Sequence, residues 1–541
     1  MKGIEKRFIY NFEPYEVVVK TLYQRPKKIS KGKYDPAILH IITKDMKTGK
    51  KDLRIIEDPQ MIVYPVKEEH VPEHNLAFIE KDKVTPMVVS YSNVEKDIAE
   101  ELGEEYTNYW YTCIKNGNYR EIGNIHKSAK IFRSDMDIED YVRYENNLQL
   151  ANDIKYDTHV GFFDIEADTI NSDGFPEPEE AECPVNALTY IDNDTNKVIT
   201  LLLRNSDNPQ IQELEDKGEE YLIKQLKNTM DTNIGKDIID KYNLNFEFTV
   251  KYFDEEIDLI GTYYKVIKKI HPDFVVAWNT RFDEPYLINR IKKLGYDPVS
   301  VIADRDNFER PMVHYYIDDR NYKHDAKNDS YKESNMHNTM DQLIIYASSQ
   351  YEVKNSYSLD FVAEDEVGFG KLNVYDYADS ISEFPWVNYE KFVIYNIFDV
   401  IAQVAIERKT RQVSNTLRRS IVNATRPQKL FRQTIKLKNR ATIEFEKQGY
   451  IISNNLNRNY SSSYGDTSSS TDLSYAGGLV ADPNLNDYIG IDIFGKPSKY
   501  IHDDVIDYDY SSLYPSIIEV FNQAANCQYG RIIFDEKDKK L

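Results

Sequence analysis

Residues 160–168 read VGFFDIEAD, and this stretch says most about the fold of the 541-residue sequence. Its apolar residues form a run long enough for a buried strand. Because successive side chains of a strand point to opposite faces, we expect Asp164 and Glu166 on one face and Phe163 and Ile165 on the other. Two neighbouring carboxylates repel each other unless a cation lies between them. Acidic residues are also common at strand ends, so this stretch alone leaves a metal site and an ordinary strand end open.

Strands and helices alternate after this stretch. Two strand-like segments within 185–204 flank a polar turn, a helical pattern covers 257–270, and a further strand is expected at 274–278. This alternation predicts an α/β layer architecture over about 155–410.

The N-terminal part has a different texture. Short apolar alternations at 16–20, 37–42 and 61–66 are separated by charged turns. They predict a small α+β domain of short strands over residues 1–154.

Composition excludes several classes of protein. With 41% hydrophobic and 29% charged residues, a chain of this length is expected to form a multidomain globule with sizeable cores. The formal charge of −22 disfavours a globally basic nucleic-acid binder and a general attraction to anionic membranes. Three widely spaced cysteines do not indicate a disulfide framework or a zinc site, and no run of about 18 apolar residues predicts a membrane span. A reducing, cytoplasmic compartment is expected.

One stretch departs from the acidic balance. Residues 407–440 contain eleven Lys and Arg residues and a single acidic residue. This pattern favours a pair of helices facing a phosphate backbone, with Arg418, Arg419 and Arg426 as candidate DNA-binding residues. A solvated helical face is the alternative. Residues 461–474, SSSYGDTSSSTDLS, have the composition of a Ser-rich linker.

Two later segments also place acidic residues on predicted elements. In 275–290 a buried strand stops at Asn279 and a helix begins near Asp283, with Pro285 in its first turn. Taken alone, Asp283 is better explained as the cap of that helix. In 395–408, Tyr395 and Asp399 lie four residues apart on a helical segment and therefore share one face. A tyrosine on an apolar face usually belongs to the core, so this pair is weak evidence by itself.

Together the three segments are specific. Asp-x-Glu on a strand, Asn-x-x-Phe-Asp at the next strand-to-helix junction and Tyr-x-x-x-Asp on a later helix resemble the exonuclease motifs of DnaQ-like 3′→5′ proofreading domains. The resemblance implies an RNase H-like fold with two Mg²⁺ or Mn²⁺ ions in the active site, and Tyr395 as the residue that orients the attacking water. The implied metal ligands are Asp164, Glu166, Asp283 and Asp399. Phosphodiester cleavage needs such a pair of ions about 4 Å apart, one to activate water and one to stabilise the leaving oxygen.

The segment 505–518, VIDYDYSSLYPSII, resembles motif A of family B DNA polymerases. The resemblance implies that Asp509 ligates both polymerase metals and that Tyr514 lies under the sugar of the incoming dNTP. It also implies that the backbone at Ser512 and Leu513 approaches the triphosphate. An acidic strand end followed by a turn into a helix is a reasonable site for phosphate and metal.

Further segments resemble the same family. YAGGLV (475–480) is similar to the Tyr-x-Gly-Gly segment between exonuclease and palm, which implies DNA contacts by Tyr475, Gly477 and Gly478; a simple turn explains the glycines equally well. DGFPEP (173–178), SYSLDFVA (356–363) and GKL (370–372) resemble the T-even-type phage branch.

The polymerase site needs motifs that do not follow Asp509. Family B enzymes carry a fingers helix, Lys-x-x-x-Asn-Ser-x-Tyr-Gly, and a Tyr-Gly-Asp-Thr-Asp-Ser turn, and neither occurs between residue 509 and residue 541. YGDTSS at 464–469 precedes motif A and lacks the second Asp, so it is not a substitute. A single aspartate cannot hold two metals for nucleotidyl transfer. We therefore expect a second polypeptide to supply the fingers, the remaining palm and the thumb.

Four segments are expected in the chain. They are an N-terminal α+β domain (1–154), a 3′→5′ exonuclease domain (155–410), a basic helical segment with a Ser-rich linker (411–474) and the beginning of a polymerase palm (475–541). The leading hypothesis is the N-terminal portion of a family B DNA-directed DNA polymerase that replicates DNA with proofreading. Its expected partners are a primer-template with a single-stranded 3′ end, dNTP, the second polypeptide and, as a further candidate, a sliding clamp, in a phage-infected bacterial cell.

Two other hypotheses stay open. One is a stand-alone single-strand 3′→5′ exonuclease with a vestigial palm. The other is a non-catalytic nucleic-acid-binding protein that uses the basic residues of 407–440. The presence of all four exonuclease carboxylates favours the enzyme hypotheses.

Overall fold

The computed structural model describes residues 8–30, 33–172, 174–318 and 320–455, and the structural statements below concern these residues. The chain divides into two compact units, Met1–Tyr464 and Gly465–Leu541, and the described residues belong to the first. Within them, no helix combines the length and the apolar character needed to cross a membrane. The predicted palm with motif A lies outside the described residues.

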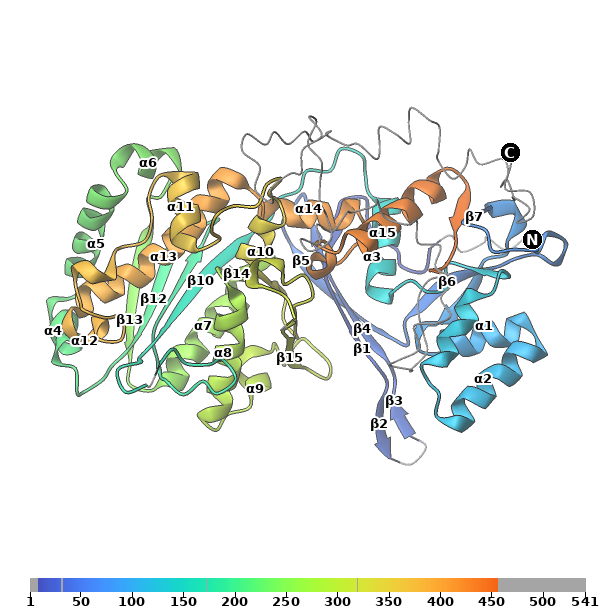
Figure 1. Cartoon of the computed structure of the whole chain (residues 1–541), viewed down its shortest axis with the longest axis horizontal. Coiled ribbons are helices and arrows are strands. Elements are labelled where there is room, and N and C mark those ends of the chain that lie inside the picture. The colour runs from blue at the N-terminus through green and yellow to red at the C-terminus, as the bar shows by residue number, and fades with distance from the viewer. Residues whose placement is uncertain (1–7, 31–32, 173, 319, 456–541) are drawn as a thin grey trace, which may run out of the picture. The chain divides into compact units, whose positions relative to one another are not determined.

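A six-stranded mixed sheet forms the centre of the predicted exonuclease region (Figure 1). Its central strand β10 pairs antiparallel with β11 and parallel with β14, which confirms the expected α/β architecture. The strands, in spatial order, are β13 (Glu247–Phe253), β12 (Lys197–Leu203), β11 (Val185–Asp192), β10 (Val160–Ala167), β14 (Phe274–Ala277) and β17 (Asn338–Asp341).

Helices cover both faces of this sheet. The 22-residue helix α13 (Tyr389–Thr410) lies against β10 and β11, and most of its length is buried. On the other face, α7 (Glu256–Ile270) and α8 (Thr280–Lys293) form a second apolar core with the side chains of Phe163 and Ile165. The two layers are visible in Figure 1, where α13 is orange and α7 and α8 are green. The sheet therefore buries both faces, as expected for its apolar strands.

Shorter elements complete this region. They are α4 (Pro209–Lys217), α5 (Glu219–Asn233), α6 (Lys236–Lys241), α9 (Pro298–Ile302), β15 (Val313–Tyr316), β16 (Ser330–Glu333), α10 (Gln342–Ala347), α11 (Leu359–Val367) and α12 (Phe384–Val387). Beyond α13 follow α14 (Ser414–Val422) and α15 (Gln433–Lys447). Single 3₁₀ segments are η1 (Glu68–His70), η2 (Lys81–Lys83), η3 (Tyr91–Asn93), η4 (Glu121–Lys127), η5 (Lys323–Asp325), η6 (Val374–Asp376) and η7 (Pro427–Lys429).

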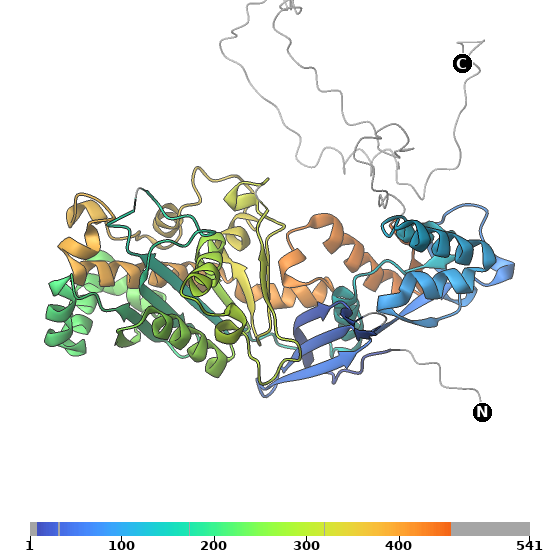
Figure 2. The ribbon, with the colours of Figure 1, turned by 90° about the horizontal axis from the view of Figure 1, so that it is seen from below.

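The N-terminal part contains the predicted short strands. The antiparallel sheet β1-β4-β5 lies beside the β15–β16 hairpin, as Figures 1 and 2 show. A second sheet has the order β8-β6-β9, and β7 pairs with β18 of the segment that follows α15. The strands are β1 (Glu16–Gln24), β2 (Lys27–Ser30), β3 (Lys33–Asp35), β4 (Ile38–Asp45), β5 (Lys51–Glu57), β6 (Gln60–Pro65), β7 (Phe78–Glu80), β8 (Met87–Ser90), β9 (Ile131–Phe132) and β18 (Tyr450–Ile452). The helices are α1 (Val94–Leu102), α2 (Glu104–Asn116) and α3 (Ile138–Gln149).

The start of α8 differs from the prediction. The helix begins at Thr280 rather than near Asp283, because Asn279 takes the left-handed conformation (φ 73°) and turns the chain directly from β14 into the helix. Pro285 consequently lies inside the helix and not in its first turn. Asp283 is therefore not the helix cap, and its side chain is free for another role.

Buried ion pairs connect the N-terminal sheet to the predicted exonuclease region. The carboxylate of Asp273, fully buried just before β14, pairs with Lys44 Nζ and Lys51 Nζ, each at 2.8 Å. The same carboxylate accepts a hydrogen bond from the backbone of His159, just before β10 (2.9 Å). Burial alone would raise the pKa of Asp273, but Lys51 and Lys44 hold it below its usual value. One carboxylate thus fixes the starts of β10 and β14 against strands β4 and β5.

Replacing Asp273 by Asn is expected to lower the free energy of unfolding by about 3–5 kcal/mol, because two buried ammonium groups lose their counter-charge. Urea denaturation of Asp273→Asn beside the wild type measures the difference. The control is Glu247→Gln, since Glu247 forms an exposed pair with Lys197 at 3.9 Å and its loss should change stability by less than about 0.5 kcal/mol. Equal stability of the two variants would contradict the structural role of Asp273.

Candidate active site

Strand β10 presents its two acidic residues to helix α13. Phe162 belongs to the core that α13 fills, whereas Phe163 and Ile165 belong to the core of α7 and α8. Asp164 and Glu166 alternate with Phe163 and Ile165 along the strand, so they face α13. The predicted division of these side chains between the two faces is confirmed.

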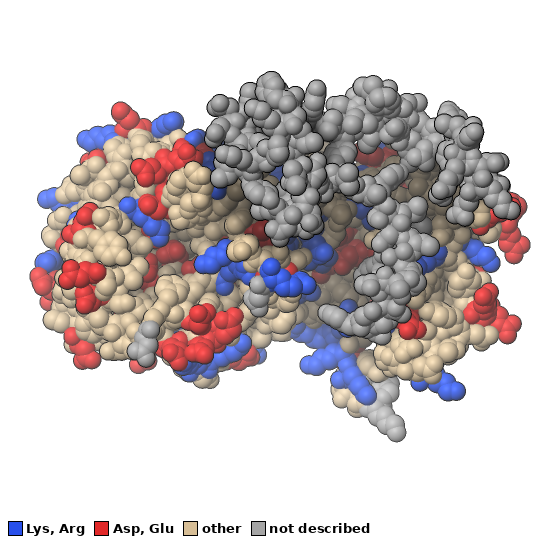
Figure 3. Space-filling view, viewed as in Figure 1, with Lys and Arg blue, Asp and Glu red and all other residues tan. Residues whose placement is uncertain are grey.

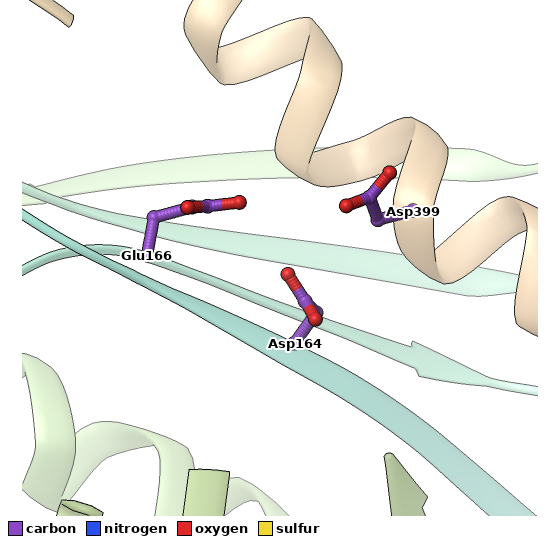
Figure 4. Close-up of side chains that lie close together, drawn as sticks. All are labelled: Asp164, Glu166 and Asp399. Atoms are coloured by element: carbon purple, nitrogen blue, oxygen red, sulfur yellow. The ribbon is translucent and has the colours of Figure 1, made fainter. Parts of the chain in front are cut away.

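Helix α13 brings Asp399 to the same place. Carboxylate oxygens of Asp164, Glu166 and Asp399 all lie within 4.8 Å of one another. Figure 4 shows the three side chains pointing toward one another, two from the strand and one from the helix. Residues more than 230 positions apart in the sequence thereby form one cluster of negative charge.

Asp283 lies next to this cluster without being one of its three members. Its side chain is 4% exposed, in the first turn of α8. Burial, followed by repulsion from Asp164 and Asp341, raises the pKa of Asp283 well above its usual value. Asp283 is thus close enough to Asp164 for the two carboxylates to repel each other. It forms a fourth acidic group beside the cluster.

Burial and mutual proximity raise the pKa of each acidic residue in the cluster. Burial, with repulsion from Asp399, raises the pKa of Asp164 to about 7. The pKa of Glu166 is raised well above its usual value by burial and then by Asp164 and Asp399. Burial also raises the pKa of Asp399, although Lys371 acts in the opposite direction. Such shifts mean that the cluster binds either protons or a cation at neutral pH.

Lys371 is a site residue that the sequence did not identify. Its ammonium forms an ion pair with Asp399 and donates a hydrogen bond to the Tyr395 hydroxyl at 3.2 Å. The segment that carries it is fixed because the Lys371 backbone N–H donates to Asp360 Oδ1 (2.7 Å). A Cβ atom at Gly370 would come within 2.2 Å of the same oxygen, so a larger residue there would displace the Asp360 carboxylate. The only sequence signal was GKL at 370–372, which resembled phage relatives but suggested no chemical role.

Asn396 is a second such residue. Its Nδ2 donates a hydrogen bond to Asp164 Oδ2 at 3.0 Å, one turn of α13 before Asp399. The bond orients the Asp164 carboxylate and supplies positive partial charge to it. The YNIFD pattern contained Asn396, but a helical Asn gives no indication of its partner before the fold is known.

The donor set fits a divalent metal. Carboxylate oxygens are the ligands that Mg²⁺ and Mn²⁺ prefer. Asp399 Oδ1 is buried and has no hydrogen-bond partner among the described residues, as a ligand atom requires. Asp164, Glu166 and Asp399 could therefore hold a first ion, and Asp283 could contribute to a second beside Asp164.

The predicted DNA-binding residues have different surroundings. Arg418 is exposed and Arg419 is partly buried on α14, whereas Arg426 is paired with Asp137, Glu139 and Asp140. Because those carboxylates neutralise its guanidinium, Arg426 joins its loop to α3 and is not available to a phosphate backbone. Figure 3 shows both signs of charge interspersed over the visible face, with Lys and Arg gathered near the position of α10. The other predicted residues, Tyr475, Gly477, Gly478, Asp509, Ser512, Leu513 and Tyr514, lie outside the described residues.

Comparison with known proteins supports the geometry. Residues 109–362 match the family model for the exonuclease domain of DNA polymerase family B. This region is therefore similar to the exonuclease domain of family B DNA polymerases. The match includes Asp164, Glu166 and Asp283, while Tyr395 and Asp399 lie beyond it and are brought to the site by the fold.

The chain is also similar in sequence to individual DNA polymerases. The chain is 27% identical over 386 residues to the DNA-directed DNA polymerase of Escherichia phage RB69, covering 68% of this chain and 36% of that protein. It is 24% identical over 321 residues to the enzyme of the same name from Enterobacteria phage T4 (55% and 33%). DNA polymerase 1 of Sulfolobus acidocaldarius is 24% identical over 388 residues (70% and 36%). Two of these relatives are phage enzymes and one is archaeal, and the chain spans about a third of the length of each.

The acidic cluster predicts a stability that depends on pH and on Mg²⁺. A carboxyl group with a raised pKa in the folded protein contributes stability that is present below about pH 4 and is lost as the pH rises through about 7. In a chelator, the melting temperature should therefore fall between pH 5 and pH 8. Mg²⁺ should raise it more at pH 8 than at pH 5, by about 2–4 °C for each kcal/mol of binding energy, because protons compete at low pH. Scanning calorimetry at both pH values measures the effect.

The matched control is Asp164→Asn with Glu166→Gln, which keeps the shape of the cluster and removes two charges. This variant should lose most of the Mg²⁺ effect and part of the pH dependence. An undiminished Mg²⁺ effect would show that the ion binds elsewhere.

Proposed function

We propose that this chain removes nucleotides from the 3′ end of single-stranded DNA by two-metal hydrolysis, as the editing activity of a family B DNA polymerase. The observation that carries the proposal is the convergence of Asp164, Glu166 and Asp399 within a region that matches the family's exonuclease domain. The 3′→5′ polarity is the one that the sequence motifs imply.

The residues of the site have separate tasks in this reaction. The carboxylates of Asp164, Glu166, Asp283 and Asp399 would hold two divalent ions, whose chemistry is the activation of water and the stabilisation of the leaving oxygen. The Tyr395 hydroxyl accepts a hydrogen bond from Lys371 and also interacts with the Asp399 carboxylate, so the phenol lies beside a metal ligand, where its proton could be shared with the attacking water. Burial raises the pKa of Tyr395 far above neutrality, so the phenol keeps that proton during the reaction.

Lys371 acts as a positioning residue. Its ammonium contacts both Asp399 and Tyr395, and therefore fixes the distance between a metal ligand and the group that orients water. Asn396 does the same for Asp164 from the neighbouring position on α13. The catalytic groups are in this way held by the helix and by one loop.

The combined variant Asp164→Ala with Glu166→Ala is expected to lower Mg²⁺-dependent digestion of single-stranded DNA by about a thousandfold or more, since several kcal/mol of charge stabilisation depend on the ions. A 5′-labelled oligonucleotide shows the loss and, by its ladder of shortened products, the polarity. Asp216→Ala with Glu220→Ala removes the same charge from exposed positions of α4 and α5 and should digest normally. Retained digestion in the first variant would refute the assignment, and a wild-type chain that only binds DNA would favour a non-catalytic role.

We further propose that Asp509 contributes to a DNA polymerase site. The support is the resemblance of 505–518 to motif A and the names of the relatives, each a DNA polymerase. The 541 residues lack the later metal-binding motif, so nucleotidyl transfer needs it from additional polypeptide, together with fingers and thumb.

Mixing this chain with a polypeptide that carries those motifs is expected to give dNTP-dependent primer extension. Asp509→Ala should reduce the extension rate by about a thousandfold, because the ligand shared by both metals is removed. Asp507→Ala is the control, two residues earlier and outside the motif position, and should extend primers at a rate near that of the wild type. Extension that survives Asp509→Ala would rule out this role.

A further inference from the structure

A pocket of about 660 Å³ lies between the end of α10, helix α14 and helix α15. We call it the α10–α14–α15 pocket. Arg418 and Arg419 line it from α14, and Lys436 lines it from α15. Although the chain has a formal charge of −22, none of the described residues that line the pocket is Asp or Glu. The pocket thus gathers three positive charges in a wall that is otherwise uncharged.

These three cations differ from their neighbours in the basic stretch. Several of those neighbours are neutralised within the fold, in the pairs Lys409–Glu366 (2.9 Å), Arg426–Glu139 (2.7 Å), Lys438–Asp135 (2.8 Å) and Arg440–Glu444 (2.8 Å). The side chains of Arg418, Arg419 and Lys436 form no hydrogen bond or ion pair with any described residue. Their charge is therefore available to a ligand.

Two of the three cations, Arg419 and Lys436, are close enough for repulsion to matter. Burial and then repulsion from Arg419 lower the pKa of Lys436, and burial lowers the pKa of Arg419. Like charges held together in partial burial are unfavourable, and an anion between them would relieve both costs. Among the described residues that line the pocket, none supplies a counter-charge.

Neutral groups complete a surface for a nucleotide. The side-chain amides of Gln412 and Gln433 line the pocket, form no hydrogen bond with a described residue and can donate to phosphate oxygens. Tyr351 also lines the pocket, and its side chain is fully exposed. An aromatic ring in that position can stack on a base.

We infer that the α10–α14–α15 pocket binds the phosphate group of a nucleotide, carried either by a single DNA strand or by a free mononucleotide. The strand form rests on the proposed function. This site is distinct from the acidic cluster, since Thr410 at the end of α13 is already about 16 Å along the helix from Asp399. The protein has a negative net charge, so it would bind a phosphate-bearing ligand through local cations, here Arg418, Arg419 and Lys436.

The test uses the full chain in a chelator, so that no metal-dependent digestion intervenes. A labelled single-stranded oligonucleotide is titrated by fluorescence anisotropy over a series of salt concentrations, and dAMP is titrated by calorimetry. In Arg419→Gln with Lys436→Gln, the slope of log affinity against log salt should shrink by about 1.4, since each cation at a single strand contributes about 0.7. Lys436→Gln alone should remove about half of that and keeps the test valid if the double variant folds poorly.

The matched control is Lys224→Gln with Lys227→Gln, two exposed positions of α5 outside the pocket. It makes the same change in net charge and should leave both titrations unchanged. A smaller slope for the strand assigns the pocket to DNA, and a tenfold loss of dAMP affinity without a slope change assigns it to a free nucleotide. Unchanged titrations in the pocket variants, or equal losses in the control, overturn the inference. Neither result depends on whether the chain digests DNA, so failure of the proposed function is scored separately.

Discussion

Repulsion between buried carboxylates is the constraint on which the rest of this structure depends. Three carboxylate oxygens within 4.8 Å of one another, on one buried and two partly buried residues, cannot carry full charge together unless a proton or a cation joins them. A fold that only needed stability would separate them or replace them with apolar residues. Here strand β10 and the largely buried helix α13 hold the charges in place. The cost in stability and the capacity to bind metal thus have the same cause.

The surroundings of the cluster limit this cost without removing it. Lys371 neutralises Asp399 from one side, and Asn396 donates to Asp164 from another, but Asp399 Oδ1 keeps no partner among the described residues. Farther away, Asp273 fixes the starts of β10 and β14 through two lysines of the N-terminal sheet. The N-terminal region therefore supports the candidate active site by fixing the start of the strand that carries the acids.

What the sequence predicted depended on local periodicity. The alternation in 160–166 correctly separated Asp164 and Glu166 from Phe163 and Ile165, because a strand has a fixed period of two. The four-residue spacing of Tyr395 and Asp399 likewise placed them on one helical face. Lys371 was not predicted as a site residue because it lies in a loop, and a loop has no periodic sequence pattern. Its position depends on the hydrogen bond from its backbone to Asp360. The start of α8 was misplaced because the left-handed turn at Asn279 ends the strand without glycine or proline.

The basic stretch shows why a count of charges cannot assign their role. Arg419 and Arg426 are equivalent in the sequence, yet Arg426 meets three carboxylates on and before α3, whereas Arg419 meets another cation. The first arrangement is self-contained, since its charges cancel inside the fold. In the second arrangement the like charges repel each other, and binding of an anion would offset that repulsion. The same reasoning applies to the acidic cluster with the signs exchanged. In both places a side chain becomes a candidate for function when the fold brings it close to like charges and supplies too few opposite charges to balance them.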